Sequence, residues 1–122
     1  MTAQAKIGQG LHEMTAQPGV EGCALVEIAT GMVWYSAGKV AEMQNISEAV
    51  SDYWRLYTRL NDHFVKLGDM KAAAFMHAQG NLTLLPCGEG VLLVALTREK
   101  STVNWAQWQS KAKELAILVN LL

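Results

Sequence analysis

Three histidines are the residues of this sequence best suited to bind a metal. His12, His63 and His77 lie far apart in the chain, and none has a cysteine or an acidic residue at metal-ligand spacing. A zinc site needs about four such side chains brought together, and two of them commonly come from one short segment. We therefore expect no metal site, and a structural or solvated role for each histidine.

Two cysteines could in principle act as nucleophiles. Cys23 and Cys87 each lie in or beside an apolar run typical of a strand. Two cysteines cannot form the disulfide framework of a small secreted protein. Buried free cysteines behave as small hydrophobic residues and are typical of a reducing compartment. The first residues also lack the apolar run of a signal peptide, so we expect a cytoplasmic chain.

No pattern in the sequence matches a catalytic or cofactor site. The serines and threonines lack a nucleophile elbow, and the glutamates form no acid–base pair. Gly88-Glu-Gly90 is followed by a strand-like run and lacks the Lys-Ser/Thr of a phosphate-binding loop. Arg55 and Arg59 could be imagined as an arginine finger for GTP hydrolysis. Exposed arginines on helices usually contact only solvent, however, so we expect no catalytic residue and no cofactor.

The composition favours one domain that contacts a protein partner. The 122 residues, 13.3 kDa in mass, suffice for a single core, and we treat residues 1–122 as one domain. A formal net charge of −1 provides no basic field for nucleic acid or for a membrane surface. No apolar stretch reaches the roughly 18 residues of a membrane span. Only 17% of residues are charged, against about 25% in average domains, so some apolar surface can be reserved for a partner.

Hydrophobic periodicity and turn signals predict the order of the elements. We expect a helix over residues 3–16, strands over 20–28 and 32–35, a long helix over 40–67, strands over 70–78, 82–85 and 91–96, and a last helix capped by Ser101-Thr102 or Asn104. Helix propensity favours a helix over 70–78, but the hairpin signal at Gln79-Gly80-Asn81 requires a preceding strand. The six apolar residues 91–96 predict a central strand covered by helices on both faces.

The long helix has more apolar surface than one contact needs. Its seam has apolar residues at alternating steps of three and four: Met43, Ile46, Val50, Tyr53, Tyr57, Leu60 and Phe64. Ala49, Trp54 and Leu56 lie outside this seam and widen the apolar arc. We therefore expect this helix to contact its own sheet and, around Tyr53, Trp54 and Tyr57, a second protein surface.

The glycine turns and apolar runs together resemble the Roadblock / dynein light chain (Roadblock-LAMTOR-like) family. The resemblance rests on Gly19-Val-Glu-Gly22 with Leu25-Val26, Gly31 with Trp34, Leu67-Gly68, Gly80-Asn-Leu-Thr-Leu-Leu-Pro86 and Gly88-Glu-Gly-Val-Leu-Leu-Val-Ala-Leu96. It implies an α+β, three-layer α/β/α fold. The profilin-like sheet would have five antiparallel strands in the order 2-1-5-4-3, with the long helix on one face and the terminal helices on the other.

The resemblance also implies how the chain works. Roadblock-like chains form homodimers, or heterodimers with a related chain, through the long helix and the third strand. The expected interface residues are Met43, Ile46, Val50, Tyr53, Trp54, Tyr57, Ala72, Ala74 and Met76. Such dimers typically bind small Ras-like GTPases as activators, exchange platforms or scaffolds. The expected function is therefore a non-enzymatic regulatory module.

Two other functions stay open at this stage. Profilin-like sheets are close in shape to small-molecule sensors, which would need a pocket lined by Trp34, Trp105 or Trp108. Core packing of Trp105 and Trp108 on the sheet competes with that interpretation. A structural subunit without a GTPase partner is the third possibility.

Overall fold

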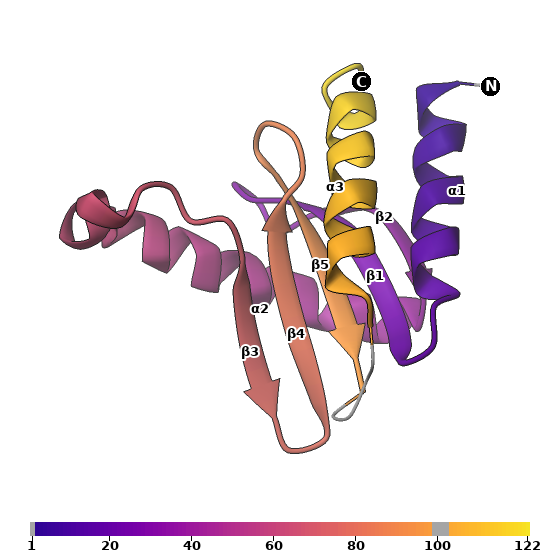
Figure 1. Cartoon of the computed structure of the whole chain (residues 1–122), viewed down its shortest axis with the longest axis horizontal. Helices are drawn as coiled ribbons and strands as arrows, with labels where there is room; N and C mark the ends of the chain where they lie inside the picture. Colours follow the sequence, from indigo (N-terminus) through magenta and orange to yellow (C-terminus); the bar gives the residue numbers. More distant parts are fainter. Residues whose placement is uncertain (1, 99–102) are drawn as a thin grey trace.

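A five-stranded antiparallel sheet forms the middle layer of the molecule, with α2 behind it and α1 and α3 in front (Figure 1). The computed structural model describes residues 2–98 and 103–122 and, in α2, leaves the side chain of Val40 undescribed. Along the chain the elements are α1 (Ala3–Thr15), β1 (Val20–Glu27), β2 (Val33–Gly38), α2 (Val40–Arg59), the 3₁₀ helix η1 (Asn61–Leu67), β3 (Ala73–His77), β4 (Gly80–Pro86), β5 (Val91–Thr97) and α3 (Trp105–Val119). The predicted order of elements is confirmed.

The strand order β2-β1-β5-β4-β3 is the predicted one. Strand β5 lies in the middle, and alternate residues point to opposite faces of the sheet. Leu93 belongs to the core beneath α1 and α3, whereas its neighbours Leu92 and Val94 belong to the core beneath α2. This double burial explains the unbroken apolar run of β5. It also puts β2 and β3 at the two edges, which α2 must connect.

The long helix is shorter than its pattern predicts. Helix α2 ends at Arg59, Leu60 closes it with φ −92° and ψ 5°, and η1 continues as a tighter 3₁₀ turn. The prediction of one helix to residue 67 is therefore wrong beyond Arg59. Asn61 and Asp62 follow at once, and such side chains compete with the helix for backbone hydrogen bonds. The 20 residues of α2 still span about 30 Å, against about 19 Å for the width of the sheet.

Strand β3 forms where helix propensity alone predicts a helix. It is confirmed as a strand but covers Ala73–His77 and not the whole of residues 70–78. Its register with β4 pairs Ala74 with Thr83 and His77 with Gly80. The hairpin therefore outweighs the alanine content, because each paired strand residue gains ladder hydrogen bonds and a packed neighbour.

The last helix packs in the core through Trp108, Ala112, Leu115 and Val119. Asn104 caps α3 by accepting a hydrogen bond from the Gln107 N–H at 3.1 Å, whereas Ser101-Thr102, the alternative cap, lie outside the described residues. Trp108 is fully buried. Trp105 is 38% exposed and packs edge-on against Trp108, so core packing, weighed above for both tryptophans, holds for Trp108 and not for Trp105. Within the described chain, no helix combines the length and apolar character that crossing a membrane requires.

Candidate interaction surface

From residue 48 to residue 60, the exposed surface of α2 is divided into an apolar and a charged flank. At 100° per residue, Tyr53, Leu56 and Leu60 fall on one side of the buried stripe together with Ala49. We call these four residues the apolar flank; Tyr53, Leu56 and Leu60 are each more than 40% exposed. The opposite side has charged residues instead: Glu48, Asp52, Arg55 and Arg59. A helix that contacted only its own sheet would not need a second apolar flank.

The centre of the predicted seam belongs to the core of its own chain. Met43 and Val50 are 0% and 1% exposed and pack in one cluster with strand residues such as Val26. The prediction that they contact a partner is therefore wrong. Ile46 and Trp54 are half-buried against the same cluster. The seam thus marks the side that covers the sheet, and the surface available to a partner lies on the apolar flank beside it.

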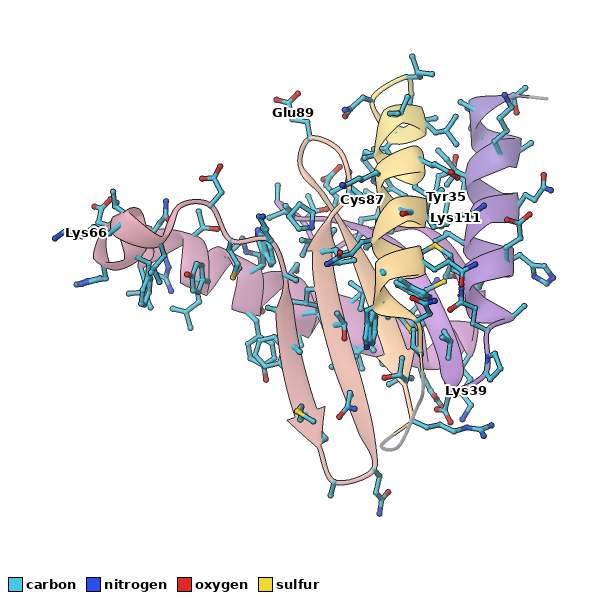
Figure 2. The ribbon with its side chains drawn as sticks, viewed as in Figure 1. Tyr35, Lys39, Lys66, Cys87, Glu89 and Lys111 are labelled. Carbon is cyan, nitrogen blue, oxygen red and sulfur yellow. The ribbon has the colours of Figure 1, made fainter. Side chains whose placement is uncertain are left out.

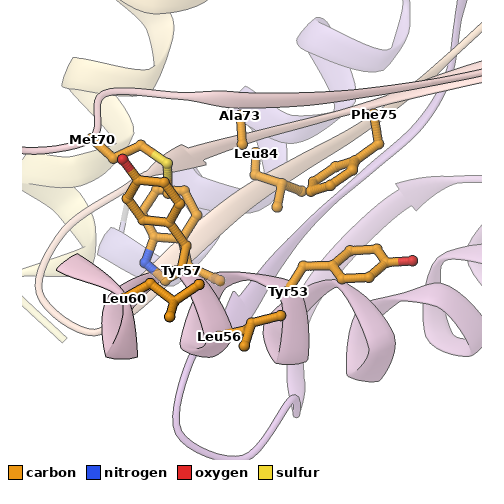
Figure 3. Close-up of a pocket in the computed structure, with 9 residues that line it drawn as sticks. Tyr53, Leu56, Tyr57, Leu60, Met70, Ala73, Phe75 and Leu84 are labelled. Carbon is orange, nitrogen blue, oxygen red and sulfur yellow. The ribbon is translucent and has the colours of Figure 1, made fainter. Parts of the chain in front are cut away.

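The apolar flank borders a hollow between α2 and β3. Figure 3 shows side chains of both elements pointing into this space. The hollow has a volume of about 200 Å³ and is lined by Tyr53, Trp54, Leu56, Tyr57, Leu60, Met70, Ala73, Phe75 and Leu84. Tyr53 stacks on Phe75 with ring centroids 4.6 Å apart. Almost all of the lining is apolar, so the hollow offers few polar groups to orient a small molecule.

The predicted interface residues of the third strand lie on the other face of the sheet. Ala73 and Phe75 pack with the α2 cluster. By strand alternation, Ala74 and Met76 point to the side of the terminal helices, where Met76 is 81% exposed. Ala72 is exposed just before the strand begins. These residues and the apolar flank therefore share one interface only if a partner approaches the edge of β3.

The end of α2 extends past this edge. Figure 1 shows α2 and η1 continuing beyond β3, outside the area of the sheet. Val65 and Leu67 of η1 are 65% and 80% exposed. Tyr57, a predicted interface residue, is half-buried and stacks on Phe64 of η1 at 5.2 Å. The apolar flank, the hollow, the β3 edge and the exposed apolar residues of η1 together make up the candidate functional site.

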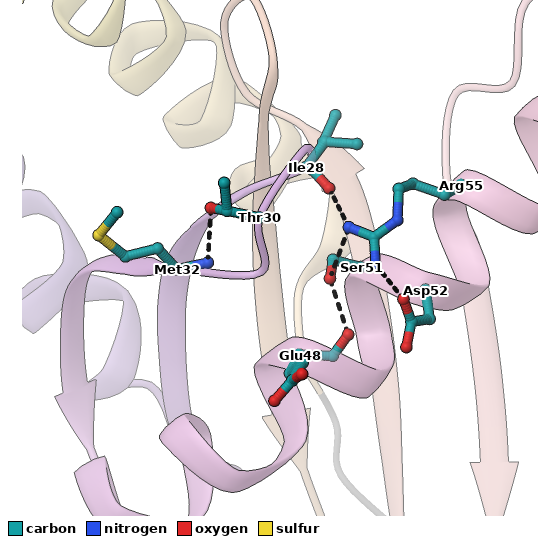
Figure 4. A network of polar contacts seen from close by, with 7 residues as sticks. All are labelled: Ile28, Thr30, Met32, Glu48, Ser51, Asp52 and Arg55. Atoms are coloured by element: carbon teal, nitrogen blue, oxygen red, sulfur yellow. Dashed lines mark hydrogen bonds and ion pairs between the residues drawn. The ribbon is translucent and has the colours of Figure 1, made fainter.

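Arg55 has a structural partner that its sequence position does not reveal. Its guanidinium donates hydrogen bonds to the Ile28 carbonyl of the β1–β2 turn and to Ser51 Oγ, and it pairs with Asp52 (Figure 4). Gly31 allows the turn to come this close, because its φ of +76° and the 2.9 Å from its Cβ position to Ser51 Oγ both disfavour a side chain. Arg55 therefore anchors the turn to α2.

Replacement of Arg55 by alanine should lower the free energy of unfolding by about 1 kcal/mol. The Ile28 carbonyl would lose a charged hydrogen-bond donor. At a partly exposed site, such a hydrogen bond contributes about 1 kcal/mol to the free energy of unfolding. Urea titration measures the loss. Arg59→Ala is the matched control, because Arg59 is an exposed arginine of the same flank and should change stability by less than about 0.5 kcal/mol. Equal losses in the two variants would contradict the anchoring role.

The two thiols are buried where they cannot act as nucleophiles. Burial raises the pKa of Cys23 to about 11, an effect that a hydrogen bond with Thr15 partly offsets. Burial likewise raises the pKa of Cys87, which lies beside α3, to about 12 (Figure 2). The cysteines are therefore protonated at neutral pH, and the predicted burial of both is confirmed.

These raised pKa values predict a loss of stability at high pH. Below the ordinary thiol pKa of 9.0 both thiols are protonated in the folded and the unfolded chain, and their contribution to folding is fully present. As the pH rises towards about 11 and about 12, the unfolded chain releases these protons first and the contribution is lost. Between pH 8 and about pH 10.5, wild type should lose about 2 kcal/mol more than Cys87→Ala in urea titrations. Parallel losses in the two proteins would contradict the burial effect.

The histidines do not meet in space. His12 on α1, His63 on η1 and His77 at the end of β3 are exposed on three different elements. In the described parts of the chain, no three histidine, cysteine or acidic side chains gather into a group that could hold a metal ion. A small-molecule sensor would need a pocket lined by Trp34, Trp105 or Trp108, and all three are absent from the lining of the α2–β3 hollow.

The fold is that of solved Roadblock/LC7 domains. The gliding protein MglB of Thermus thermophilus is 13% identical, with a TM-score of 0.85 over 100% of this chain and 94% of that one. MglB of Myxococcus xanthus is 16% identical, with a TM-score of 0.82 over 96% and 97% of the two chains. A Roadblock/LC7 domain of Streptomyces avermitilis is 18% identical, with a TM-score of 0.68 over 95% and 91%. No family model and no curated protein matches the sequence.

Proposed function

From the Roadblock/LC7 fold of this chain we infer that residues 1–122 are one Roadblock-family domain, a non-enzymatic regulatory or scaffold module. It works as a dimer, with itself or with a related chain, and the dimer binds a small Ras-like GTPase. The observation that carries this proposal is the apolar surface formed by α2, η1 and the β3 edge. The GTPase follows from what Roadblock-like dimers typically bind.

The β3 edge and the apolar flank favour a two-fold partner. A strand with small, uncharged side chains at the edge of a sheet invites pairing when left open. Ala73 and Ala74 leave the β3 backbone accessible, and β4 occupies only its other side. In a two-fold dimer the same patch serves both copies, so β3 would pair with β3 in one ten-stranded sheet. Such pairing also brings the overhanging end of α2 over the sheet of the partner.

In the proposed dimer, the partner would cover the hollow. A partner's apolar flank would meet the flank residues Leu56 and Leu60 and cover the opening of the 200 Å³ hollow. Aromatic residues such as Tyr53 are common at the centres of interfaces, because they bury a large area at little cost in entropy. The end of α2 and η1 would then contact the partner, and the exposed Val65 and Leu67 of η1 would no longer face water.

The proposed module acts on a GTPase by contact and not by supplying a catalytic group. Arg55 is engaged with the β1–β2 turn of its own chain, which argues against a free arginine finger. Stimulation of hydrolysis would then come from positioning the GTPase's own switch residues.

A Ras-like GTPase encoded beside this chain tests the proposal. The purified proteins are mixed, complex formation is followed by size-exclusion chromatography, and single-turnover phosphate release is timed. A complex with faster release identifies an activator, and a complex with unchanged release identifies a scaffold. Absence of a complex in both nucleotide states would overturn the GTPase part of the proposal and leave the dimer to be judged separately.

A further inference from the structure

Part of the sheet face on the side of the terminal helices is open (Figure 1). Figure 1 shows α1 and α3 side by side over one part of the sheet, while β3 and β4 lie beside α3 without a helix in front of them. The exposed Met76 and the half-buried Thr83 point to this side of β3 and β4. This area lies on the opposite face of the sheet from the apolar flank of α2.

A groove runs along α3 at the upper end of this open area. Its volume is about 480 Å³, and its apolar lining comes from Met70, Leu85, Pro86, Ala112 and Ala116. Leu85 and Ala112 are only 7% and 6% exposed, so they form a floor and not a protruding patch. The groove therefore presents recessed apolar atoms that a partner can reach without displacing α3.

The open area has the width of one helix. Two strands at a spacing of about 4.8 Å cover about 10 Å when half a spacing is counted on the outer side of each strand axis, and this is also the diameter of a helix with its side chains. On α3, Ala112 and Ala116 are one turn apart and line the groove. Such small side chains allow a neighbouring helix to approach closely. A helix laid beside α3 would thus extend the helical layer over β3 and β4.

The charged residues that line the groove have one sign. Among the described lining residues the charged ones are Lys71 and Lys113, both exposed, and no carboxylate joins them. Lys71 lies at the approach to β3 and Lys113 on α3, so the lysines come from two separate elements. Their ammonium groups would attract carboxylates on a bound segment and repel a basic one.

We propose that this groove binds an amphipathic helix of a partner protein, with its apolar stripe on the floor and acidic residues towards Lys71 and Lys113. The apolar stripe, the helical shape and the acidic residues of this partner follow from the recessed apolar floor, the width of the open area and the two lysines. The proposal does not rest on the GTPase. Of the residues that it uses, Met70 also lines the hollow between α2 and β3, and the others lie outside both that hollow and the apolar flank of α2.

A pair of designed peptides tests the proposal. Each is an amphipathic helix of about 18 residues with the same leucine stripe, and the polar positions carry glutamate in one and lysine in the other. Fluorescence anisotropy of the labelled peptides with the full chain gives the two dissociation constants. We expect the acidic peptide to bind at least ~10-fold more tightly, and the difference to shrink at high salt.

Charge reversal locates the binding site. The double variant Lys71→Glu with Lys113→Glu should weaken the acidic peptide by at least ~10-fold and leave the circular dichroism spectrum unchanged, since both side chains are exposed. Lys66→Glu is the control, because Lys66 is an exposed lysine on η1, far from the groove (Figure 2). Equal affinity for both peptides, no binding of either, or unchanged binding in the double variant would each overturn the proposal. Loss of peptide binding in Leu56→Glu, with binding kept in the double variant, would also overturn the proposal, because it would place the peptide on the apolar flank.

Discussion

Val50→Glu should leave the chain unfolded at neutral pH. Val50 is 1% exposed and packs in the core between α2 and the sheet. A carboxylate at this position has no partner in the apolar cluster, and burial of an unpaired charge costs several kcal/mol. The free energy of unfolding of natural domains is only about 5–15 kcal/mol, so this single change can remove most of the stability. Far-UV circular dichroism and urea titration measure the loss.

Gln44→Glu is the matched control for this variant. It places the same charge in the same helix at an exposed position on the side of the charged flank, away from the proposed interface. The spectrum and the unfolding midpoint of Gln44→Glu should stay close to those of wild type. A folded, soluble Val50→Glu protein would instead mean that Val50 faces a partner, as the seam of the sequence first suggests.

Leu56→Glu should split the dimer without unfolding the chain. Leu56 is 46% exposed on the apolar flank and lines the hollow next to β3. In a two-fold dimer each substitution acts twice, and a carboxylate against an apolar surface weakens association each time. We expect the dimer dissociation constant to rise by at least ~100-fold. Analytical ultracentrifugation over a concentration series measures this constant.

Gln44→Glu is the control for the added charge. Gln44 is exposed on α2 but on the side of the charged flank, so the same new carboxylate lies away from the proposed interface. Its dissociation constant should match that of wild type. If both variants dissociate alike, net charge and not the apolar flank governs association. If Leu56→Glu remains dimeric, the interface lies elsewhere.

Local patterns predict most of the fold. The apolar run 91–96 identifies β5 as the central strand, because only a strand buried on both faces needs six consecutive apolar residues. The hairpin signal at Gly80 identifies β3 against its helix propensity. The early end of α2 was also predictable from Asn61 and Asp62, which are poor helix formers.

The interaction surface is harder to predict from the sequence. A period of three and four residues shows that Met43, Val50 and Tyr53 share one side of a helix, but not which body covers each of them. The angle at which α2 crosses the sheet decides that Val50 is buried and Leu56 is exposed. Contacts between distant segments are equally hidden, since Arg55 and the Ile28 carbonyl lie 27 residues apart.

The mass of the wild-type protein in solution tests the central claim most directly. Sedimentation equilibrium at tens of micromolar should give a single species of twice the 13.3 kDa chain mass. The second copy in the proposed dimer would cover the apolar flank, the hollow and the open β3 edge. A single species of 13.3 kDa at the same concentration, with the apolar flank still exposed to water, would contradict a self-associating regulatory module.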